Sequence, residues 1–278
     1  MNNGLSFSVR LLLRINRLFA PTGHPFNIEG KSYAEWQFDK GEETLGCFSG
    51  YAEKKRLISG KTVLDVGCGA AGKSVFCAVS GASKVIGCDR FDYSKEAEKT
   101  AELHGVSDKF KFVRADAASL PFSDGGFDVV IMSDFIEHAK DVKAAVSEAL
   151  RVCKPGGTVL INFTSYRHPR GAHLSDAVNV PWCQFFFSEK TLVAAYRYLI
   201  SDKSDREYRE NLKLDESKTK ISYINRITIG KFDKLLKRMH IKPAYRARIP
   251  LRRRLSAATH LPFFGECITH SAVYVLEK

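Results

Sequence analysis

The sequence predicts an α/β fold with a doubly wound, largely parallel sheet, and two observations support this prediction. Short apolar runs of strand length alternate with helix-length amphipathic runs between residues 60 and 164. Such alternation is typical of a parallel sheet with helices on both faces. A glycine-rich turn at 67–72 leads directly from the first apolar run into a helix, where glycine permits a tight connection. Residues 60–164 are therefore expected to form the core.

Hydrophobic periodicity and turn residues place the elements of this core. Each strand is a short run rich in Val, Ile and Phe, and each helix has apolar residues at helical spacing. The expected strands are 62–66, 84–89, 110–114, 127–132 and 158–163, and the expected helices are 72–80, 94–104 and 141–153.

The flanks of the core have a different pattern. Residues 1–59 are expected to form an N-terminal helical cap, with one amphipathic helix at 5–20. The regular alternation stops at 165–225, an insertion predicted to be a substrate lid. Residues 226–278 are expected to complete the core with a helix capped by Thr228 and two strands at 242–250 and 271–277.

The net charge of +12 is concentrated in the C-terminal part of the chain. Residues 160–278 carry 22 basic and 11 acidic side chains, whereas residues 60–159 carry 13 and 14. A basic region of this kind favours an anionic partner, such as nucleic acid, a membrane surface or an acidic substrate. The seven cysteines form no CxxC pair, so neither a disulfide framework nor a metal site is expected.

The glycine turn fits two known patterns at once. Gly67-Cys-Gly-Ala-Ala-Gly72-Lys73-Ser74 matches both the dinucleotide fingerprint GxGxxG and the phosphate loop GxxxxGKS. In a phosphate loop, Lys73 would meet the terminal phosphates and Ser74 a magnesium ion. In a dehydrogenase, Asp89 would bind a ribose.

Carboxylates at the ends of three strands argue against a polyphosphate ligand. Asp65, Asp89 and Asp116 would all face the same crevice and repel phosphate. A cofactor with a positive sulfonium and no phosphate suits them better.

Several motifs in order resemble the class I, seven-stranded Rossmann-like methyltransferases that depend on S-adenosylmethionine, with a type 11-like methyltransferase domain. The resemblance covers about residues 60–165 and the last two strands. It implies a seven-stranded, mostly parallel sheet with an antiparallel last strand, and S-adenosylmethionine as the cofactor. The residues that carry it are Val-Leu-Asp65-Val-Gly67-Cys68-Gly69, Ile-Gly-Cys-Asp89, Ala115-Asp116-Ala117, Leu120-Pro121-Phe122, Phe127-Asp128-Val-Val, Glu137-His138 and Leu150-Arg-Val-Cys-Lys-Pro155-Gly156-Gly157.

The resemblance also assigns cofactor-binding roles. The glycines let the backbone approach the methionine moiety, Asp89 accepts the ribose hydroxyls, and Asp116 accepts from the adenine amine. Arg90 stands where the family often has an apolar residue against the adenine. Lys73 and Ser74 would then be only the first turn of a helix. The predicted cofactor residues are Asp65, Gly67, Cys68, Gly69, Asp89, Arg90, Asp116, Ala117 and Ser133.

Candidate catalytic residues lie beyond the fourth strand and in the lid. His138 follows that strand, and His173 and Tyr166 belong to the insertion; histidine can act as a base near neutral pH. Acceptor-binding candidates are the aromatic and histidine residues Trp36, Tyr33, His168 and Trp182.

The predicted function is methyl transfer to a small-molecule or lipid-like acceptor. The stretch from 249 to 264 mixes arginines with apolar residues and is expected to permit peripheral membrane contact. Nucleic acid is not expected as a partner, although an RNA methyltransferase is the first alternative and a phosphate-loop nucleotide-binding protein the second. No secretory signal is evident, so a cytoplasmic location is expected.

Overall fold

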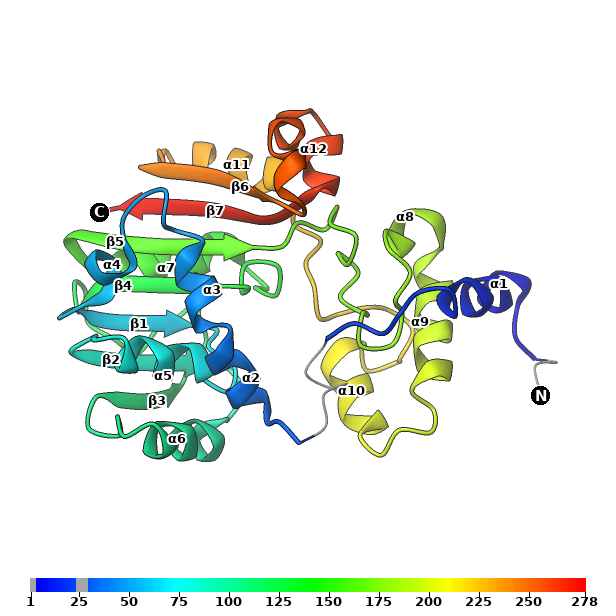
Figure 1. Ribbon diagram of the computed structural model, residues 1–278, viewed down its shortest axis with the longest axis horizontal. Coiled ribbons are helices and arrows are strands. Elements are labelled where there is room, and N and C mark those ends of the chain that lie inside the picture. Colours follow the sequence, from blue (N-terminus) through cyan, green and yellow to red (C-terminus); the bar gives the residue numbers. More distant parts are fainter. Residues whose placement is uncertain (1–3, 24–29) are drawn as a thin grey trace.

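A seven-stranded sheet forms the centre of the protein, seen in a computed structural model that describes residues 4–23 and 30–278 (Figure 1). The strand order is β3-β2-β1-β4-β5-β7-β6. Neighbours among β1 to β5 pair in parallel, whereas β7 is antiparallel to both β5 and β6. The predicted fold class is confirmed.

All seven predicted strands are present, with differences at their ends. The fifth strand begins five residues before the predicted start, because Cys153 already pairs with Phe127 ahead of the Pro155-Gly-Gly157 segment and regular pairing resumes at Thr158. Of the last two strands, β6 begins later than predicted and β7 begins earlier. The strands are β1 Thr62–Val66, β2 Lys84–Asp89, β3 Phe110–Arg114, β4 Phe127–Ser133, β5 Cys153–Phe163, β6 Tyr245–Pro250 and β7 Thr269–Glu277.

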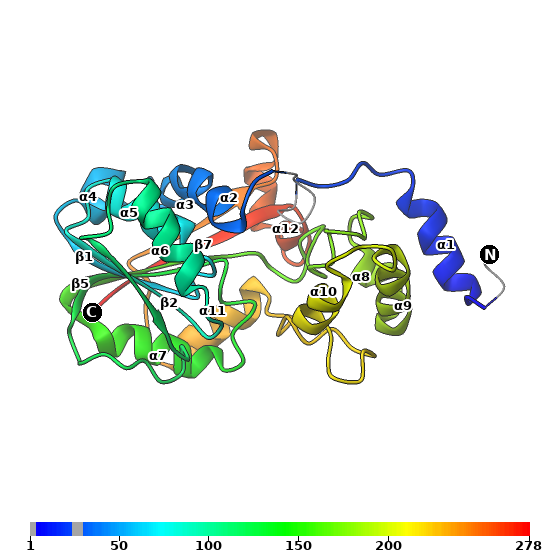
Figure 2. The ribbon, with the colours of Figure 1, turned by 90° about the horizontal axis from the view of Figure 1, so that it is seen from below.

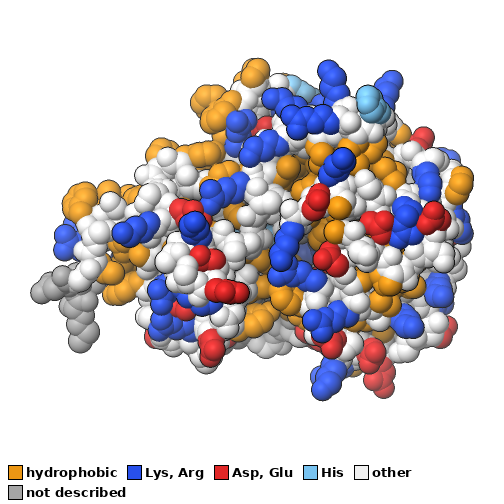
Figure 3. Space-filling model, turned by 180° about the vertical axis from the view of Figure 1, so that it is seen from behind, with side chains coloured by type: hydrophobic (Ala, Val, Ile, Leu, Met, Phe, Trp, Pro, Cys, Tyr) orange, Lys and Arg blue, Asp and Glu red, His pale blue; other side chains and the backbone are white. Residues whose placement is uncertain are grey.

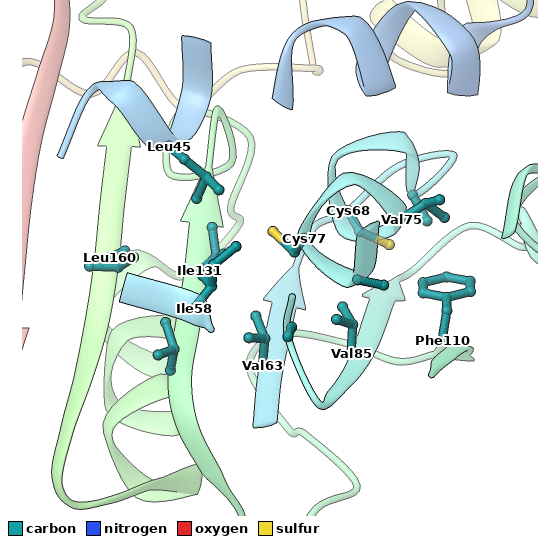
Figure 4. Close-up of a cluster of buried hydrophobic side chains, with 14 of the residues drawn as sticks. Leu45, Ile58, Val63, Cys68, Val75, Cys77, Val85, Phe110, Ile131 and Leu160 are labelled. Carbon is teal, nitrogen blue, oxygen red and sulfur yellow. The ribbon is translucent and has the colours of Figure 1, made fainter. Parts of the chain in front are cut away.

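Helices cover both faces of the sheet. One face packs against α3 Gly41–Gly46, α4 Lys54–Ile58, α5 Gly72–Val79 and α6 Ser94–Leu103. Figure 4 shows side chains of this cluster rising from neighbouring strands towards the helices, among them Val63, Ile131 and Leu160. The other face packs against α7 Val142–Val152 and α11 Ile229–Arg238.

Local capping fixes where the two helices on the second face begin. The carboxylate of Asp141 accepts the Ala144 N–H at the start of α7. The predicted Thr228 cap is confirmed, since its hydroxyl accepts the Lys231 N–H at 3.2 Å. Such caps satisfy backbone donors that have no partner within the helix.

The insertion at 165–225 folds into a separate body beside the sheet (Figure 2). It contains α8 Cys183–Phe186, α9 Glu189–Leu199 and α10 Arg206–Lys213. The N-terminal helix α1, Phe7–Asn16, packs on α9 and shares its hydrophobic cluster. By contrast, α2, Tyr33–Asp39, packs on α5 of the core. The segment predicted as one cap is therefore divided between the lid and the core.

A short helical segment, here called the excursion, separates β6 from β7. The sequence patterns did not predict this segment. It consists of two 3-10 turns, η2 Arg253–Leu255 and η3 Ala257–His260, and of α12 Phe264–Cys267. The carboxylate of buried Glu266 accepts the N–H groups of Ile229 and Gly230 at the start of α11. This excursion is thereby fixed to the core.

A buried ion network holds the lid together. The side chain of Asp176 is inaccessible to solvent and accepts from Lys213 Nζ at 2.7 Å, from Arg209 at 3.3 Å and from the Tyr196 hydroxyl at 2.8 Å. Asp176 therefore connects α9 and α10 to the loop after β5.

We predict that Asp176→Ala destabilises the protein by about 3–5 kcal/mol, because removing one member of a buried ion pair leaves the remaining charges without that partner. The measurement is the free energy of unfolding in urea. Asp124→Ala is the control, since this carboxylate pairs with Arg151 while 78% exposed and should cost less than about 1 kcal/mol. Equal losses in the two variants would show that the lid does not depend on the network.

Candidate cofactor and acceptor site

The glycine turn after β1 requires glycine for two reasons. Gly67 and Gly69 have φ angles of +73° and +56°, which L side chains rarely adopt. A Cβ on Gly67 would also overlap the ring of Phe135. The N–H groups of Gly67 and Cys68 both donate to the Cys88 carbonyl, at 2.8 and 3.0 Å, so the turn is held at the end of β2.

Helix α2 closes over this turn. The side chain of Gln37 donates to the Cys68 carbonyl at 3.1 Å and accepts the Gly72 N–H at 3.3 Å. The Tyr33 hydroxyl also lies against Gly69, since a Cβ atom added to Gly69 would be 3.2 Å from the hydroxyl oxygen. Tyr33 thus lies against the glycine turn, and the centres of its ring and of the Trp36 ring are 6.2 Å apart. The predicted acceptor-binding role of both residues stays a prediction.

The predicted carboxylates lie at the carboxyl ends of three neighbouring strands. Asp65 is buried and accepts the Ser74 hydroxyl at 2.6 Å, and burial raises its pKa to about 6. Asp89 accepts the N–H groups of Gly69 and Phe91 at 3.0 and 2.9 Å, and burial raises its pKa too. Each carboxylate is thus oriented by the turn that it borders.

Asp116 and Arg90, which the resemblance places beside an adenine, are more exposed. Asp116 follows β3 and accepts the Ala118 N–H at 2.9 Å, with Ala117 half-buried between them. The guanidinium of Arg90 lies 4.6 Å from the centre of the Phe91 ring. Arg90 and Phe91 therefore form a stacked pair at the end of β2 rather than two independent candidates for stacking on a base.

Lys73 and Ser74 are more than the first turn of a helix, which corrects the sequence prediction. The ammonium of Lys73 reaches β4, where it donates to the Ser133 hydroxyl at 3.1 Å and to Asp134 at 2.7 Å. Ser74 donates to Asp65. Both residues therefore pair with carboxylates of the protein, Lys73 with Asp134 and Ser74 with Asp65.

His138, a predicted base, lies in a turn after β4 and is held by a hydrogen bond to the insertion. Its Nδ1 lies 2.8 Å from the Tyr223 carbonyl, which can only accept, so Nδ1 carries the proton and Nε2 the lone pair. Burial lowers the pKa of the imidazole to about 4. The rings of His173 and Tyr223 lie 4.9 and 4.1 Å from it, so core and lid meet here.

Asn225, at the end of the lid, fixes the turn that carries His138. Its side-chain amide donates to the carbonyls of Ile136 and Ala139 at 2.7 and 2.8 Å, and its N–H donates to the Glu137 carbonyl at 2.9 Å. The position of His138 therefore depends on the end of the insertion.

Glu137 is a buried carboxyl group next to this turn. One oxygen accepts the Thr164 N–H at 3.2 Å, and the other has no hydrogen-bond partner within the described part of the chain. Burial, and then the charge of Asp134, raise its pKa to about 8. Glu137 therefore holds a proton more readily than an exposed glutamate does.

The other predicted lid residues are placed apart from His138 and His173. Tyr166 packs into the hydrophobic cluster of the lid, near Arg226 and Glu189. His168 accepts the Arg170 N–H at Nδ1, so its proton is on Nε2. That Nε2 and the indole N–H of Trp182 are buried donors without a partner among the residues described. Their roles in catalysis or acceptor binding stay predictions.

Five contributors to the site were not predicted from the sequence. Lys73 directly follows the glycine turn, and Asp134 directly follows an apolar strand. The neighbouring sequence could therefore have indicated both residues. Gln37, Tyr223 and Asn225 had none, because they reach the site only through the tertiary fold.

No group of three or more His, Cys, Asp and Glu side chains that could hold a metal ion occurs within residues 4–23 and 30–278. Over the same residues, no helix is both long and apolar enough to cross a membrane.

The central part of the chain is similar to a known family. Residues 64–161 match the methyltransferase domain family. Sterol 24-C-methyltransferase of Pneumocystis carinii is 37% identical over 102 residues, 36% of this chain and 27% of that protein. Chloroplastic tocopherol O-methyltransferase of Arabidopsis thaliana is 33% identical over 135 residues, 48% of this chain and 38% of that protein. The chain thus spans less than two fifths of the length of these two relatives.

Solved structures share the fold over nearly the whole chain. An S-adenosylmethionine-dependent methyltransferase from Mesorhizobium loti superposes with a TM-score of 0.54 at 15% identity, covering 87% of this chain and 100% of that one. The [4+2]-cyclase SpnF superposes with a TM-score of 0.52 at 17% identity, covering 98% and 92%. At these identities the likeness concerns the fold alone, and the cyclase shows that the fold serves more than one reaction.

The protein has the class I methyltransferase fold. Its defining features are the order of the strands, the glycine turn after β1 and the carboxylates at the strand ends. Within it, residues 64–161 match the methyltransferase domain family.

Proposed function

We propose that this protein transfers a methyl group from S-adenosylmethionine to a small-molecule or lipid-like acceptor. The observation that carries the proposal is the row of carboxylates Asp65, Asp89 and Asp116 along adjacent strand ends, with the uncharged imidazole of His138 beyond β4. The sterol and tocopherol methyltransferases among the relatives support a lipid-like acceptor.

The residues at the turn fit this cofactor. Asp89, next to the Gly69 N–H, would accept from the ribose hydroxyls, and Asp116 from the adenine amine. The crevice is acidic, which suits a cation and disfavours a phosphate. When bound, S-adenosylmethionine supplies a methyl group activated by its sulfonium.

His138 would then act on the acceptor. An oxygen or nitrogen nucleophile must lose a proton when it gains a methyl group, and Nε2 of His138 has the lone pair to accept it. The lid residue His173, whose ring lies against His138, would position the acceptor. The lid excludes water and holds the nucleophile in line, which is the protein's main contribution to a displacement of this kind.

A surface next to the lid supports peripheral membrane contact. Phe186 of α8 and Phe264 of α12 are 75% and 69% exposed. Phe185 and Phe263 connect the two helices through a ring separation of 6.2 Å, although 78 positions separate them in the sequence. Exposed Arg252, Arg253 and Arg254 lie in the same excursion.

Figure 3 shows hydrophobic side chains beside Lys and Arg side chains along the upper edge of the molecule. Aromatic groups that enter the headgroup region and arginines that attract anionic lipid are the features of an interfacial surface. A membrane-bound acceptor could then reach the lid directly. The cytoplasmic location expected from the sequence stays a prediction.

The first prediction concerns the cofactor. By titration calorimetry the protein should bind S-adenosylhomocysteine and not Mg-ATP, and Asp89→Ala should abolish binding because the ribose hydroxyls lose their acceptor. His173→Ala, in the lid, is the control and should bind normally. If ATP binds and S-adenosylhomocysteine does not, the proposed function is wrong.

The second prediction concerns the base. His138→Ala should lower methyl transfer roughly 10²- to 10⁴-fold, the usual contribution of a general base, with unchanged S-adenosylhomocysteine affinity. Because the pKa of His138 is lowered to about 4, the imidazole is uncharged from pH 6 to 8 and gains a proton only as the pH falls towards 4. Transfer of labelled methyl into a lipid extract should therefore be independent of His138 protonation across pH 6–8. A rate that rises through a pKa near 6.5 and loses that rise in His138→Ala would contradict this assignment.

The third prediction concerns the membrane surface. Sedimentation with vesicles of phosphatidylglycerol should exceed that with phosphatidylcholine and should fall at high salt. Reversing the charge of Arg252, Arg253 and Arg254 to Glu should abolish it. The matched control reverses Lys234, Lys237 and Arg238 of α11 and should still bind. Equal binding to both lipids, or salt-dependent binding of RNA instead, would favour another partner.

A further inference from the structure

Helix α1 has apolar side chains on two sides. On one side, Val9, Leu12 and Leu13 are buried against α9 in the hydrophobic cluster of the lid. On the outer side, Phe7 and Leu11 are about one helical turn apart and both are exposed, Phe7 by 72%. The outer side of a helix that borders only water is usually polar. The outer side of α1 therefore has the character of a contact surface.

The exposed apolar surface continues past the end of the helix. Leu18 and Phe19 follow the C-cap residue Arg17, and Leu18 is 81% exposed. Single exposed hydrophobic side chains are common, whereas several together on one element indicate an interaction site. We call Phe7, Leu11, Leu18 and Phe19 the α1 patch. Figure 3 shows hydrophobic side chains together with Lys and Arg side chains at the left end of the molecule, where α1 lies.

The charges around the α1 patch are all positive. Arg10, Arg14 and Arg17 are exposed, and no acidic side chain pairs with them within residues 4–23 and 30–278. Residues 1–28 of the sequence contain no Asp or Glu. Anionic lipid headgroups attract such arginines, while the layer just beneath them takes up exposed Phe and Leu side chains. The patch and its arginines are therefore complementary to an anionic membrane surface.

Hydrogen bonds fix α1 to the lid. The side-chain amide of Asn16 donates to the Ala177 carbonyl at 3.0 Å, and its oxygen accepts the Asn179 N–H at 2.6 Å. After the helix, the Thr22 hydroxyl donates to the Ser175 carbonyl at 2.6 Å. These bonds join the helix to the loop between β5 and α8. A membrane that holds α1 therefore also orients the lid.

We propose that α1 is an interfacial helix, which inserts the α1 patch into an anionic membrane and thereby anchors the lid. With ten residues the helix is too short to span a bilayer, so it lies in the plane of the headgroups. In Figure 1, α12, α8 and α1 follow one another along the upper right outline of the molecule. The exposed phenylalanines of α8 and α12 are therefore a second contact with the same membrane.

The two contacts depend on each other. Two weak contacts on one folded chain bind far more strongly together than either does alone, so the loss of either one should release the protein from the membrane. The anchor rests on the proposed function only in taking the membrane as the source of the acceptor.

The test is sedimentation of the full chain with vesicles of phosphatidylglycerol. Phe7→Ser combined with Leu18→Ser should weaken binding roughly 10- to 100-fold, because two side chains lose their apolar contact with the membrane. Val79→Ser combined with Leu103→Ser is the matched control, since it removes exposed apolar side chains from α5 and α6 and should bind normally. Melting curves and S-adenosylhomocysteine affinity should be the same in both variants.

A second measurement separates insertion from attraction by charge. The fluorescence added by Leu18→Trp should be quenched by brominated phosphatidylglycerol, whereas that added by Leu103→Trp should not. Changing Arg10, Arg14 and Arg17 to Gln should weaken binding to phosphatidylglycerol roughly 100-fold and leave binding to phosphatidylcholine unchanged.

Unchanged vesicle binding in folded Phe7→Ser, Leu18→Ser would overturn the anchor while leaving the proposed methyl transfer intact. A dimer that forms without lipid and is lost in this variant would also overturn it, because the α1 patch would then bind a second copy of the chain. Failure of the unaltered protein to bind S-adenosylhomocysteine would count against the proposed function alone, since vesicle binding does not require the cofactor.

Discussion

Four parallel strands end side by side at one edge of the sheet, and a carboxylate stands at or just beyond the end of each one. Asp65, Asp89, Asp116 and Asp134 come from β1, β2, β3 and β4, which are adjacent in the order β3-β2-β1-β4. Like charges at such spacing repel one another, so the edge favours a ligand that brings positive charge or hydrogen-bond donors. The glycine turn, α2 and Lys73 are all arranged around this constraint.

The insertion at 165–225, the predicted lid, does not share the sheet's core. Its own hydrophobic cluster includes α1, and its ion network centres on Asp176. Two contacts nevertheless fix the catalytic candidate from the lid, because the Tyr223 carbonyl sets the tautomer of His138 and Asn225 holds the turn that carries it. The packing of the insertion therefore also determines the orientation of the His138 side chain.

Sequence reasoning predicted the strands and their carboxylates because both depend on local signals. Asp89 follows an apolar run of strand length, and a parallel sheet brings such strand ends together whatever the details of packing. The reach of Lys73 could not be predicted, since a flexible side chain selects its partner only after β4 is in place. Gln37 and Tyr223 lie 31 and 85 positions from the residues that they contact, and no periodicity encodes those distances.

The residues predicted to meet the acceptor also differ in this way: some follow a local sequence signal, and others are placed only by the tertiary fold. His138 was predicted from its place after the fourth strand, whereas the contact of Tyr33 with the glycine turn exists only in the folded chain. The excursion between β6 and β7 carried a visible run of arginines, but its contact with α8 through Phe263 and Phe185 exists only in the folded chain.

A crystal structure with S-adenosylhomocysteine tests the central claim most directly. We expect electron density at the carboxyl edge of the sheet, with the ribose on Asp89 and the sulfur facing His138 under the predicted lid. Density elsewhere, or a ligand at this edge that makes no contact with Asp89, would contradict the proposed function.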